Sequence, residues 1–317
     1  MIKPFFAGAG ATLGTLALHG RAAAREAAFE AAFPPEGRIL DVGGVPVHAV
    51  VRGTGPDLVM IHGASGNARD FTFDLMGRLA GRYRCIAFDR PGLGYTGHTY
   101  ARYGARFGSA AETPAEQAAL LAAAYARVGR GAPLVLGHSF GGTIALAWGL
   151  DHAARGLVLL GAASNIWEGG LGPLYALNAS APGGALAVPL LTATVSEARL
   201  RRITAAIFAP DPIPEGYFAH VGAQLTLRRD SLRTNARQVN GLKPHIAEME
   251  RRYATLDLPI EIVHGTADTI VPADIHAKVL IDMLPHGRLT LLDGVGHMPH
   301  HAAPAPVIAA IDRLRDA

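Results

Sequence analysis

The chain has 317 residues, of which 50% are hydrophobic and 17% are charged, and its formal net charge is +3. This composition is typical of a folded globular protein and excludes intrinsic disorder. The single cysteine, Cys85, excludes an intramolecular disulfide, and no cluster of cysteine and histidine has the spacing of a structural zinc module. The arginines form no basic run, so the positive charge does not indicate a nucleic-acid partner.

The first 36 residues are predicted to form a separate segment. Residues 5–18 carry no charge, and as a helix they would span about 21 Å, which is less than the ~30 Å hydrocarbon core of a bilayer. A helix then continues toward Pro34. Three interpretations are open: a membrane-associated segment bracketed by Lys3 and Arg21, a signal peptide cleaved near Ala22-Ala23-Ala24, or a segment that folds onto the domain. We expect membrane association, and a soluble cytoplasmic enzyme is the alternative.

From Ile39 onward, short apolar segments alternate with helical patterns, which is typical of an α/β fold with a parallel sheet covered on both faces. Gly43-Gly44 between the first two segments indicates a hairpin, so the sheet is expected to begin antiparallel and then become parallel. We predict eight strands, at residues 39–42, 46–52, 57–62, 83–89, 133–138, 156–162, 259–264 and 288–292.

The helix predicted over residues 113–129 has the clearest start. Thr113 is its expected N-cap and Pro114 its first residue, and Glu116 completes a capping box. A long run of alanine and leucine follows, so we expect this helix to be placed correctly.

Residues 163–257, between the sixth and the seventh predicted strands, show no alternation of strand and helix patterns. They are rich in helix-forming residues that prolines interrupt, and a structureless loop of that length inside a compact domain is uncommon. We therefore predict a helical cap at 163–257, inserted into a core made of residues 37–162 and 258–317.

A serine flanked by glycines lies in the sequence Gly-His-Ser-Phe-Gly-Gly at 137–142. The residues before it predict a strand and those after it a helix, so Ser139 is expected on a tight turn that pushes its hydroxyl out of the sheet. The start of the helix also favours developing negative charge at this point. Ser139 is therefore the candidate nucleophile.

A serine nucleophile needs a base, and the base needs a carboxylate that orients it. Asp268 follows the seventh predicted strand and His297 follows the eighth. Because the carboxyl ends of parallel strands meet at one edge of a sheet, we predict that Ser139, His297 and Asp268 form a catalytic triad. The alternative bases are His300 and His301, and the reserve acid is Glu168.

The oxyanion of an acyl-transfer intermediate needs hydrogen-bond donors. The amide of Phe140, directly after the candidate nucleophile, is expected to supply one, and the amide of Ala64 in the loop after the third strand another. Gly63 and Gly66 would let this loop approach a substrate closely. Ser65, in the same loop, is a candidate substrate-binding residue.

Apolar side chains of the predicted cap are candidates for the wall of a substrate pocket. We select Trp167 and Phe208 as substrate-binding residues, and we expect the pocket to accept an uncharged, hydrophobic acyl or alcohol group. The alternative is that these side chains form only the core of the cap. The other candidates are Ile166, Leu171, Leu174, Tyr175 and Ile207.

Five motifs occur together in the order and spacing of a known family. They are HGASG at 62–66, DRPGLGYT at 89–96, GHSFGG at 137–142, HGTAD at 264–268 and GHMPH at 296–300. Through them, residues 39–317 resemble the α/β-hydrolase superfamily. The resemblance implies a covalent acyl-enzyme on Ser139, and this serine argues against haloalkane dehalogenases and epoxide hydrolases, in which an aspartate takes its place. The N-terminal segment is similar to that of bacterial members with a membrane segment.

The expected function is hydrolysis of a carboxylic ester, because the triad and the oxyanion hole suffice for it without a metal or an organic cofactor. A carbon–carbon bond hydrolase and a cofactor-free, haloperoxidase-like perhydrolase use the same residues and stay open. A non-catalytic ligand-binding protein on the same scaffold is a further alternative. The expected partner is a small hydrophobic ester, and the sequence does not indicate the oligomeric state.

Overall fold

The computed structural model describes residues 3–105, 108–170 and 172–316. Its centre is an eight-stranded sheet with the order β1-β2-β4-β3-β5-β6-β7-β8. β2 is antiparallel to β1 and β4, and every other neighbouring pair is parallel, which confirms the predicted mostly parallel sheet that begins with a hairpin. The strands are β1 (Arg38–Val42), β2 (Val45–Arg52), β3 (Asp57–Ile61), β4 (Arg84–Phe88), β5 (Leu134–His138), β6 (Gly156–Leu160), β7 (Ile260–Gly265) and β8 (Gly287–Leu292).

Helices cover both faces of the sheet, so every residue of β3, β5 and β6 is buried. Side chains of α4 (Pro114–Ala126) and α5 (Phe140–Asp151) pack on one face, and those of α3 (Leu75–Leu79) and α14 (Pro304–Asp316) on the other. Burial on both faces explains why these strands are apolar throughout. The shorter helices around the sheet are α2 (Arg69–Thr72), η1 (Ala101–Gly104), α12 (Ala277–Met283) and α13 (Pro299–Ala302).

The predicted capping box is present at the start of α4. Thr113 Oγ1 accepts a hydrogen bond from the Glu116 amide at 3.1 Å, and Glu116 Oε2 accepts one from the Thr113 amide at 2.9 Å. These two bonds satisfy amides that the first helical turn leaves without partners. α4 ends at Ala126, three residues before the predicted end.

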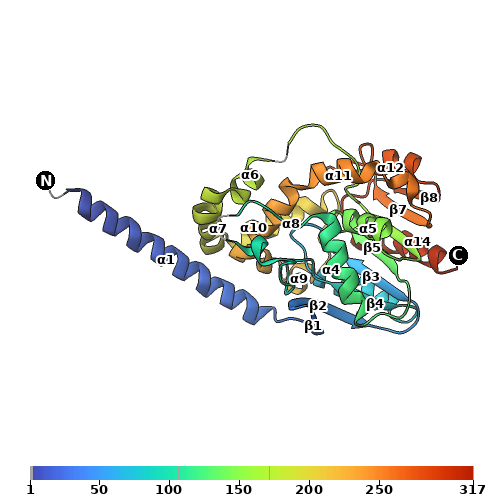
Figure 1. The fold of residues 1–317 in the computed structure, drawn as a ribbon, viewed down its shortest axis with the longest axis horizontal. Helices are drawn as coiled ribbons and strands as arrows, with labels where there is room; N and C mark the ends of the chain where they lie inside the picture. Colours follow the sequence, from blue (N-terminus) through green and yellow to red (C-terminus); the bar gives the residue numbers. More distant parts are fainter. Residues whose placement is uncertain (1–2, 106–107, 171, 317) are drawn as a thin grey trace.

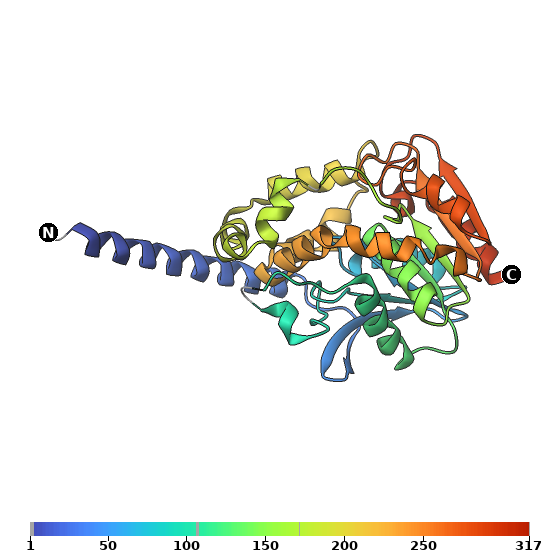
Figure 2. The ribbon, with the colours of Figure 1, turned by 45° about the horizontal axis from the view of Figure 1, so that its top comes forward.

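Between β6 and β7 the described residues, 161–170 and 172–259, contain helices and loops but no strand. Figure 2 shows them stacked beside the sheet, in yellow-green to orange. They are α6 (Pro173–Ala179), the π-helical turn η2 (Gly183–Ala187), α7 (Val188–Thr194), α8 (Glu197–Phe208), α9 (Tyr217–Val221), η3 (Ala223–Leu227), α10 (Arg229–Asn240), α11 (Leu242–Glu250) and η4 (Tyr253–Thr255).

The N-terminal segment is one helix, α1 (Lys3–Ala32). Its N-terminal part projects from the body of the molecule (Figures 1 and 2), whereas its C-terminal part packs on α7 and η3. There the Glu26 carboxylate accepts hydrogen bonds from Arg229, with Nε at 2.9 Å and an Nη at 2.7 Å. Arg25 donates to the Val195 carbonyl at 2.7 Å. The second half of α1 is therefore attached to the helices between β6 and β7.

Among the described helices, none is by itself both long enough and apolar enough to cross a membrane. Two helical segments taken together, Pro173–Ala179 and Gly183–Thr194, are long and apolar enough by this criterion, and they are bent by 89° relative to each other.

Candidate active site

Ser139 lies on the sharp turn from β5 into α5, with φ 53° and ψ −120°. A non-glycine residue with positive φ is strained, and the packing of the turn maintains the conformation. A Cβ at Gly137 would overlap the Gly141 carbonyl, and one at Gly141 would overlap the Ile61 carbonyl. The two glycines are therefore needed for the turn that presents the serine.

His297 and Asp268 come from the loops after β8 and β7, as the sequence predicts. His297 Nδ1 lies 2.7 Å from Asp268 Oδ2, and both side chains are buried. Asp268 Oδ1 accepts hydrogen bonds from the amides of Ile270 and Val271, each at 2.9 Å. The carboxylate is thus fixed by its own loop and can orient the imidazole.

The charge state of Asp268 follows from its partners. Burial by itself would raise the pKa of Asp268, but His264, His297 and the amide of Val271 hold this pKa well below its usual range. The carboxylate is therefore ionised at neutral pH, as an orienting acid in a triad requires.

His138, the residue before the candidate nucleophile, supports the backbone of the base. Its Nε2 lies 2.9 Å from the carbonyl oxygen of His297. Burial and the neighbouring imidazoles of His300 and His297 lower the pKa of His138 well below its ordinary value, so this ring is neutral and its Nε2–H donates to the carbonyl. This contact ties the loop of His297 to the turn of Ser139.

Two backbone amides beside Ser139 have the properties of an oxyanion hole. In the described part of the chain the amides of Phe140 and Ala64 have no hydrogen-bond acceptor. The loop of Ala64 lies against the serine, because a Cβ at Gly63 would be 3.1 Å from the Ser139 Cβ. Gly63 therefore permits the close approach that both donors need.

Ser65 has a positive φ of 56°, and Asn235 of α10 holds it in place. Asn235 Oδ1 accepts a hydrogen bond from the Ser65 amide at 2.7 Å, and Asn235 Nδ2 donates to Ser65 Oγ at 2.9 Å. The sequence did not single out Asn235, because its partner is 170 residues away along the chain.

Arg90 is a fully buried cation behind this loop. Its guanidinium lies 3.9 Å from the centre of the Phe140 ring and donates to the Gly63 carbonyl at 3.1 Å. Gln117 and Gln238 accept its other hydrogen bonds. Burial lowers the pKa of Arg90 to about 9, so the group is still charged at neutral pH. Arg90 thus joins the two segments that carry the candidate oxyanion donors.

Ser139 and His297 open into a cavity of about 490 Å³ between the sheet and the helices that follow β6. Ser139 Oγ makes no hydrogen bond within the described residues, and apo geometry of this kind often tightens only when a substrate binds. The wall is mainly apolar. It includes Ala64, Ser65, Leu174, Tyr175, Leu200, Ile203, Ile207, Phe208, Tyr217, Val221 and Leu227.

The structure separates the candidates for this wall. Ser65 and Phe208 line the cavity, as expected. Trp167 does not, and the expectation that it binds substrate is wrong in this structure: its ring packs beside His276 at 6.2 Å, against the core. Ile166 is also absent from the wall, and Leu171 lies outside the described residues. Trp167 precedes α6, so it lies before the helix that reaches the cavity.

The alternative bases His300 and His301 belong to a second buried network. Their Nε2 atoms lie 3.1 Å and 2.8 Å from the two oxygens of Asp70, which also accepts a hydrogen bond from Tyr217 at 2.8 Å. Burial by itself would raise the pKa of Asp70, but the two imidazoles hold this pKa well below its usual range. Neither histidine contacts Asp268, and the reserve acid Glu168 is exposed.

Asp70, His300 and His301 are also the residues best placed to hold a metal ion, since their ligand atoms lie within 4.8 Å of one another. The Asp70 oxygens already accept hydrogen bonds from both imidazoles and from Tyr217. The buried Nδ1 atoms of both histidines have no partner among the described residues, whereas metal-bound imidazoles usually donate from their second nitrogen. The group fits a hydrogen-bonded network better than a metal site.

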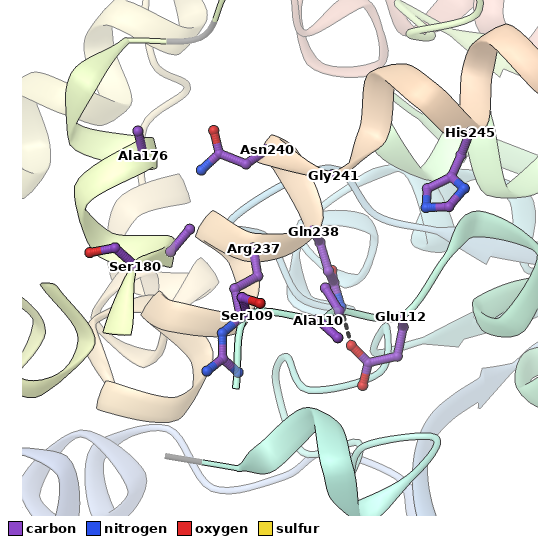
Figure 3. Close-up of a pocket in the computed structure, with 12 residues that line it drawn as sticks. Ser109, Ala110, Glu112, Ala176, Ser180, Arg237, Gln238, Asn240, Gly241 and His245 are labelled. Atoms are coloured by element: carbon purple, nitrogen blue, oxygen red, sulfur yellow. Dashed lines mark hydrogen bonds between the residues drawn. The ribbon is translucent and has the colours of Figure 1, made fainter. Parts of the chain in front are cut away.

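A larger cavity of about 600 Å³ lies beside α6, and Figure 3 shows its wall. α6 contributes Ala176 and Ala179 to it, and Leu174, Tyr175 and Asn178 to the cavity that contains Ser139, so this helix separates the two. Gln238 donates to Glu112 at 3.0 Å in this wall. The wall contains none of the predicted catalytic residues, so its greater size does not make it the reaction site.

Comparisons with known proteins agree with this geometry. The profile described as the Alpha/beta hydrolase family matches residues 58–310. An uncharacterized protein of Mycobacterium tuberculosis is 26% identical over 283 residues, which are 84% of this chain and 77% of that protein. The esterase RhEst1 from Rhodococcus sp. ECU1013 has a TM-score of 0.65 at 24% identity, covering 87% of this chain and 97% of its own. A bacterial membrane phospholipase A has a TM-score of 0.67 at 17% identity and covers 100% of both chains.

Proposed function

Since this chain belongs to the alpha/beta hydrolase family, we propose that it is a serine hydrolase that cleaves a carboxylic ester through an acyl-enzyme. The observation that carries the proposal is the pairing of His297 Nδ1 with Asp268 Oδ2 at 2.7 Å, in the cavity into which the strained turn presents Ser139. A nucleophile, a base and an orienting acid on three loops at one edge of the sheet match the requirements of acyl transfer.

The mechanism follows from these positions. His297 accepts the proton of Ser139 as its oxygen attacks the ester carbonyl, and Asp268 stabilises the imidazolium that forms. The amides of Phe140 and Ala64 bind the oxyanion of the tetrahedral intermediate. His297 then protonates the departing alcohol. In the second half of the reaction His297 activates a water molecule, which releases the acid from Ser139.

The cavity supports a hydrophobic substrate. Of the side chains that line it, those of Leu200, Ile203, Ile207 and Phe208 come from α8 and contain only carbon and hydrogen. A cavity of about 490 Å³ lies within the range of small-molecule sites. We expect medium-length acyl esters to be hydrolysed faster than charged ones. A panel of p-nitrophenyl esters of varied chain length, with dicarboxylic monoesters as the charged members, tests this expectation, and a preference for the anionic members would contradict it.

The decisive experiment is the Ser139→Ala variant, assayed with a short p-nitrophenyl ester and with a fluorophosphonate probe. We expect kcat to fall at least ~10³-fold and labelling to disappear, with an unchanged circular dichroism spectrum. Ser180→Ala, beside the other cavity, is the matched control and should keep both signals. Near-normal activity in Ser139→Ala would refute the mechanism. Absence of labelling in the unmodified chain would favour a non-catalytic binding protein.

We also propose that α1 associates with a membrane. Its residues 5–18 carry no charge, the helix projects from the body of the molecule, and Leu16 is 64% exposed. An apolar helix that projects in this way is more favourable in a lipid interface than in water. Fractionation of cells that express the full chain tests the proposal. An uncleaved protein that stays in the supernatant at low and high salt would contradict it.

A further inference from the structure

The helical pair α6 and Gly183–Thr194 presents an unusual surface. Residues 169–196 form a run of 28 residues without Asp, Glu, Lys, Arg or His. Four leucines of this run are about half exposed or more: Leu174 at 52%, Leu177 at 47%, Leu186 at 61% and Leu190 at 51%. We name these four side chains the leucine face. Soluble surfaces scatter single apolar side chains, whereas these four come from three elements that pack on one another, α6, η2 and α7, and a large apolar surface marks a site of interaction.

The leucine face does not result from poor packing of the helices. Val188, Pro189, Thr192 and Ala193 of α7 are buried, while Leu190 of α7 and Leu186, four residues earlier in η2, are exposed. α7 also packs against α1. The helix thus has a protein side and an apolar outer side, and a polar outer side would be expected if water covered it.

The position of the leucine face identifies its occupant. α6 and α7 lie at the end of the molecule from which α1 projects (Figures 1 and 2). Leu174 lines the catalytic cavity and is 52% exposed, and the same holds for Ile203 of α8 at 48%. The mouth of the cavity therefore opens beside this face. An uncharged surface beside the opening of a hydrophobic cavity, at the end of the molecule from which an apolar helix projects, suits a lipid bilayer, because protein partners usually meet a polar rim.

We propose that the leucine face rests on a lipid bilayer, so that the catalytic cavity receives hydrophobic esters directly from the membrane. The proposal depends on the proposed esterase function only for the chemistry of the substrate. The docking of the leucine face on the bilayer does not depend on the triad. α1 and the leucine face then contact the same bilayer at two separate points.

The experiment uses the single native thiol to advantage. Cys85 is fully buried in β4, and burial raises its pKa to about 12, so the folded protein does not react there with a maleimide dye. Leu186→Cys and Leu190→Cys each introduce one reactive thiol outside the catalytic cavity. Val279→Cys on α12 is the matched control, since Val279 is 42% exposed at the far end of the molecule. Each full-length variant carries an environment-sensitive dye and is mixed with vesicles of phosphatidylcholine and phosphatidylglycerol.

We expect dyes at 186 and 190 to be quenched by doxyl-labelled lipid and protected from aqueous iodide, and a dye at 279 to behave in the opposite way. If the chain binds vesicles while the dyes at 186 and 190 remain as accessible to iodide as the dye at 279, α1 alone makes the contact and the proposal is overturned. Protection of these dyes from iodide without vesicles, together with a dimer in gel filtration, would assign the face to a second copy and also overturn the proposal.

A second measurement separates docking from chemistry. The double variant Leu186→Asp/Leu190→Asp should hydrolyse a soluble short ester at the normal rate. Its rate on an ester embedded in vesicles should be at least about tenfold lower than that of the unmodified chain. Val279→Asp should lose neither activity. If the double variant keeps the normal rate on both substrates, the proposal is overturned. If the unmodified chain hydrolyses neither substrate, the esterase function is refuted instead.

Discussion

His98 connects three parts of the molecule through two acidic partners. Its Nδ1 lies 2.7 Å from Glu112 Oε1, before α4, and its Nε2 lies 3.0 Å from Asp230 Oδ2 on α10. The His98 side chain is 12% exposed. Burial by itself would lower the pKa of His98, but the hydrogen bonds and charges of Asp230 and Glu112 raise it to about 9. The imidazolium therefore joins the loop after β4 to the helices that follow β6.

The raised pKa predicts how this contact contributes to stability. A rise from 6.5 to about 9 corresponds to about 3 kcal/mol of preference for the charged form in the folded state. Because the folded pKa is the higher one, the full contribution is present below about pH 6.5. It decreases as the pH rises and is lost above about pH 9. Water screens the Asp230 side chain, which is 64% exposed, so His98→Gln should lower the free energy of unfolding by about 2 kcal/mol at pH 6, and by much less at pH 10.

Urea unfolding of both proteins at pH 6 and pH 10, followed by circular dichroism, measures the difference. His286→Gln is the matched control, since His286 lies 3.1 Å from Asp257 but is 58% exposed, and such surface pairs contribute little. A loss of equal size at pH 6 and pH 10 in His98→Gln would show that His98 acts through packing alone, and would refute the reasoning from charge.

Three further predictions concern the turn and the triad. Asp268→Asn should lower kcat about 10⁴-fold with little change of fold, because an amide favours the wrong imidazole tautomer; wild-type kcat would argue against its role. Gly137→Ala should prevent folding or lower the free energy of unfolding in urea by at least ~3 kcal/mol, because the new Cβ overlaps the Gly141 carbonyl. Its control is Gly77→Ala in α3, where the Cβ meets nothing within 4 Å; this change should stabilise the protein by about 0.5 to 1 kcal/mol. Arg90→Met should lower kcat about tenfold and change KM less. A change in KM alone would refute a link between Arg90 and the oxyanion donors.

Local patterns were sufficient to place the strands and the candidate triad. Every strand end lies within two residues of its predicted position, because apolar runs between turn residues are determined by neighbours in the sequence. Ser139 and His297 reach one cavity, and Asp268 lies 2.7 Å from His297, because each of the three follows a parallel strand. The rule that strand ends meet at one edge needs no side-chain detail. Their catalytic roles remain predictions.

Contacts between distant residues could not be read from the sequence. Tyr217 and His301 reach Asp70 across 147 and 231 residues, so no local pattern joins them. Trp167 is an example of the opposite kind. Its apolar side chain in the predicted cap made it a candidate for the pocket, but the structure packs it beside His276 instead. The attachment of α1 through Glu26 and Arg229 could not be predicted either, because the two residues are 203 positions apart and polar pairs at this distance give no periodic signal.

The two halves of α1 predict different results for two truncations. A chain that begins at His19 loses the uncharged residues but keeps the contact of Glu26 with Arg229. It should bind membranes more weakly than the full chain, with its Tm and its activity on short esters unchanged. A chain that begins at Pro34 also loses this pair, which is 18% and 32% exposed, and should unfold about 5 °C lower, from the loss of about 2 kcal/mol. Its activity should fall as well, because α1 packs on η3, which supplies part of the cavity wall. Differential scanning fluorimetry and ester hydrolysis measure both effects, and equal Tm and kcat/KM for the two truncated chains would show that the second half of α1 does not support the site.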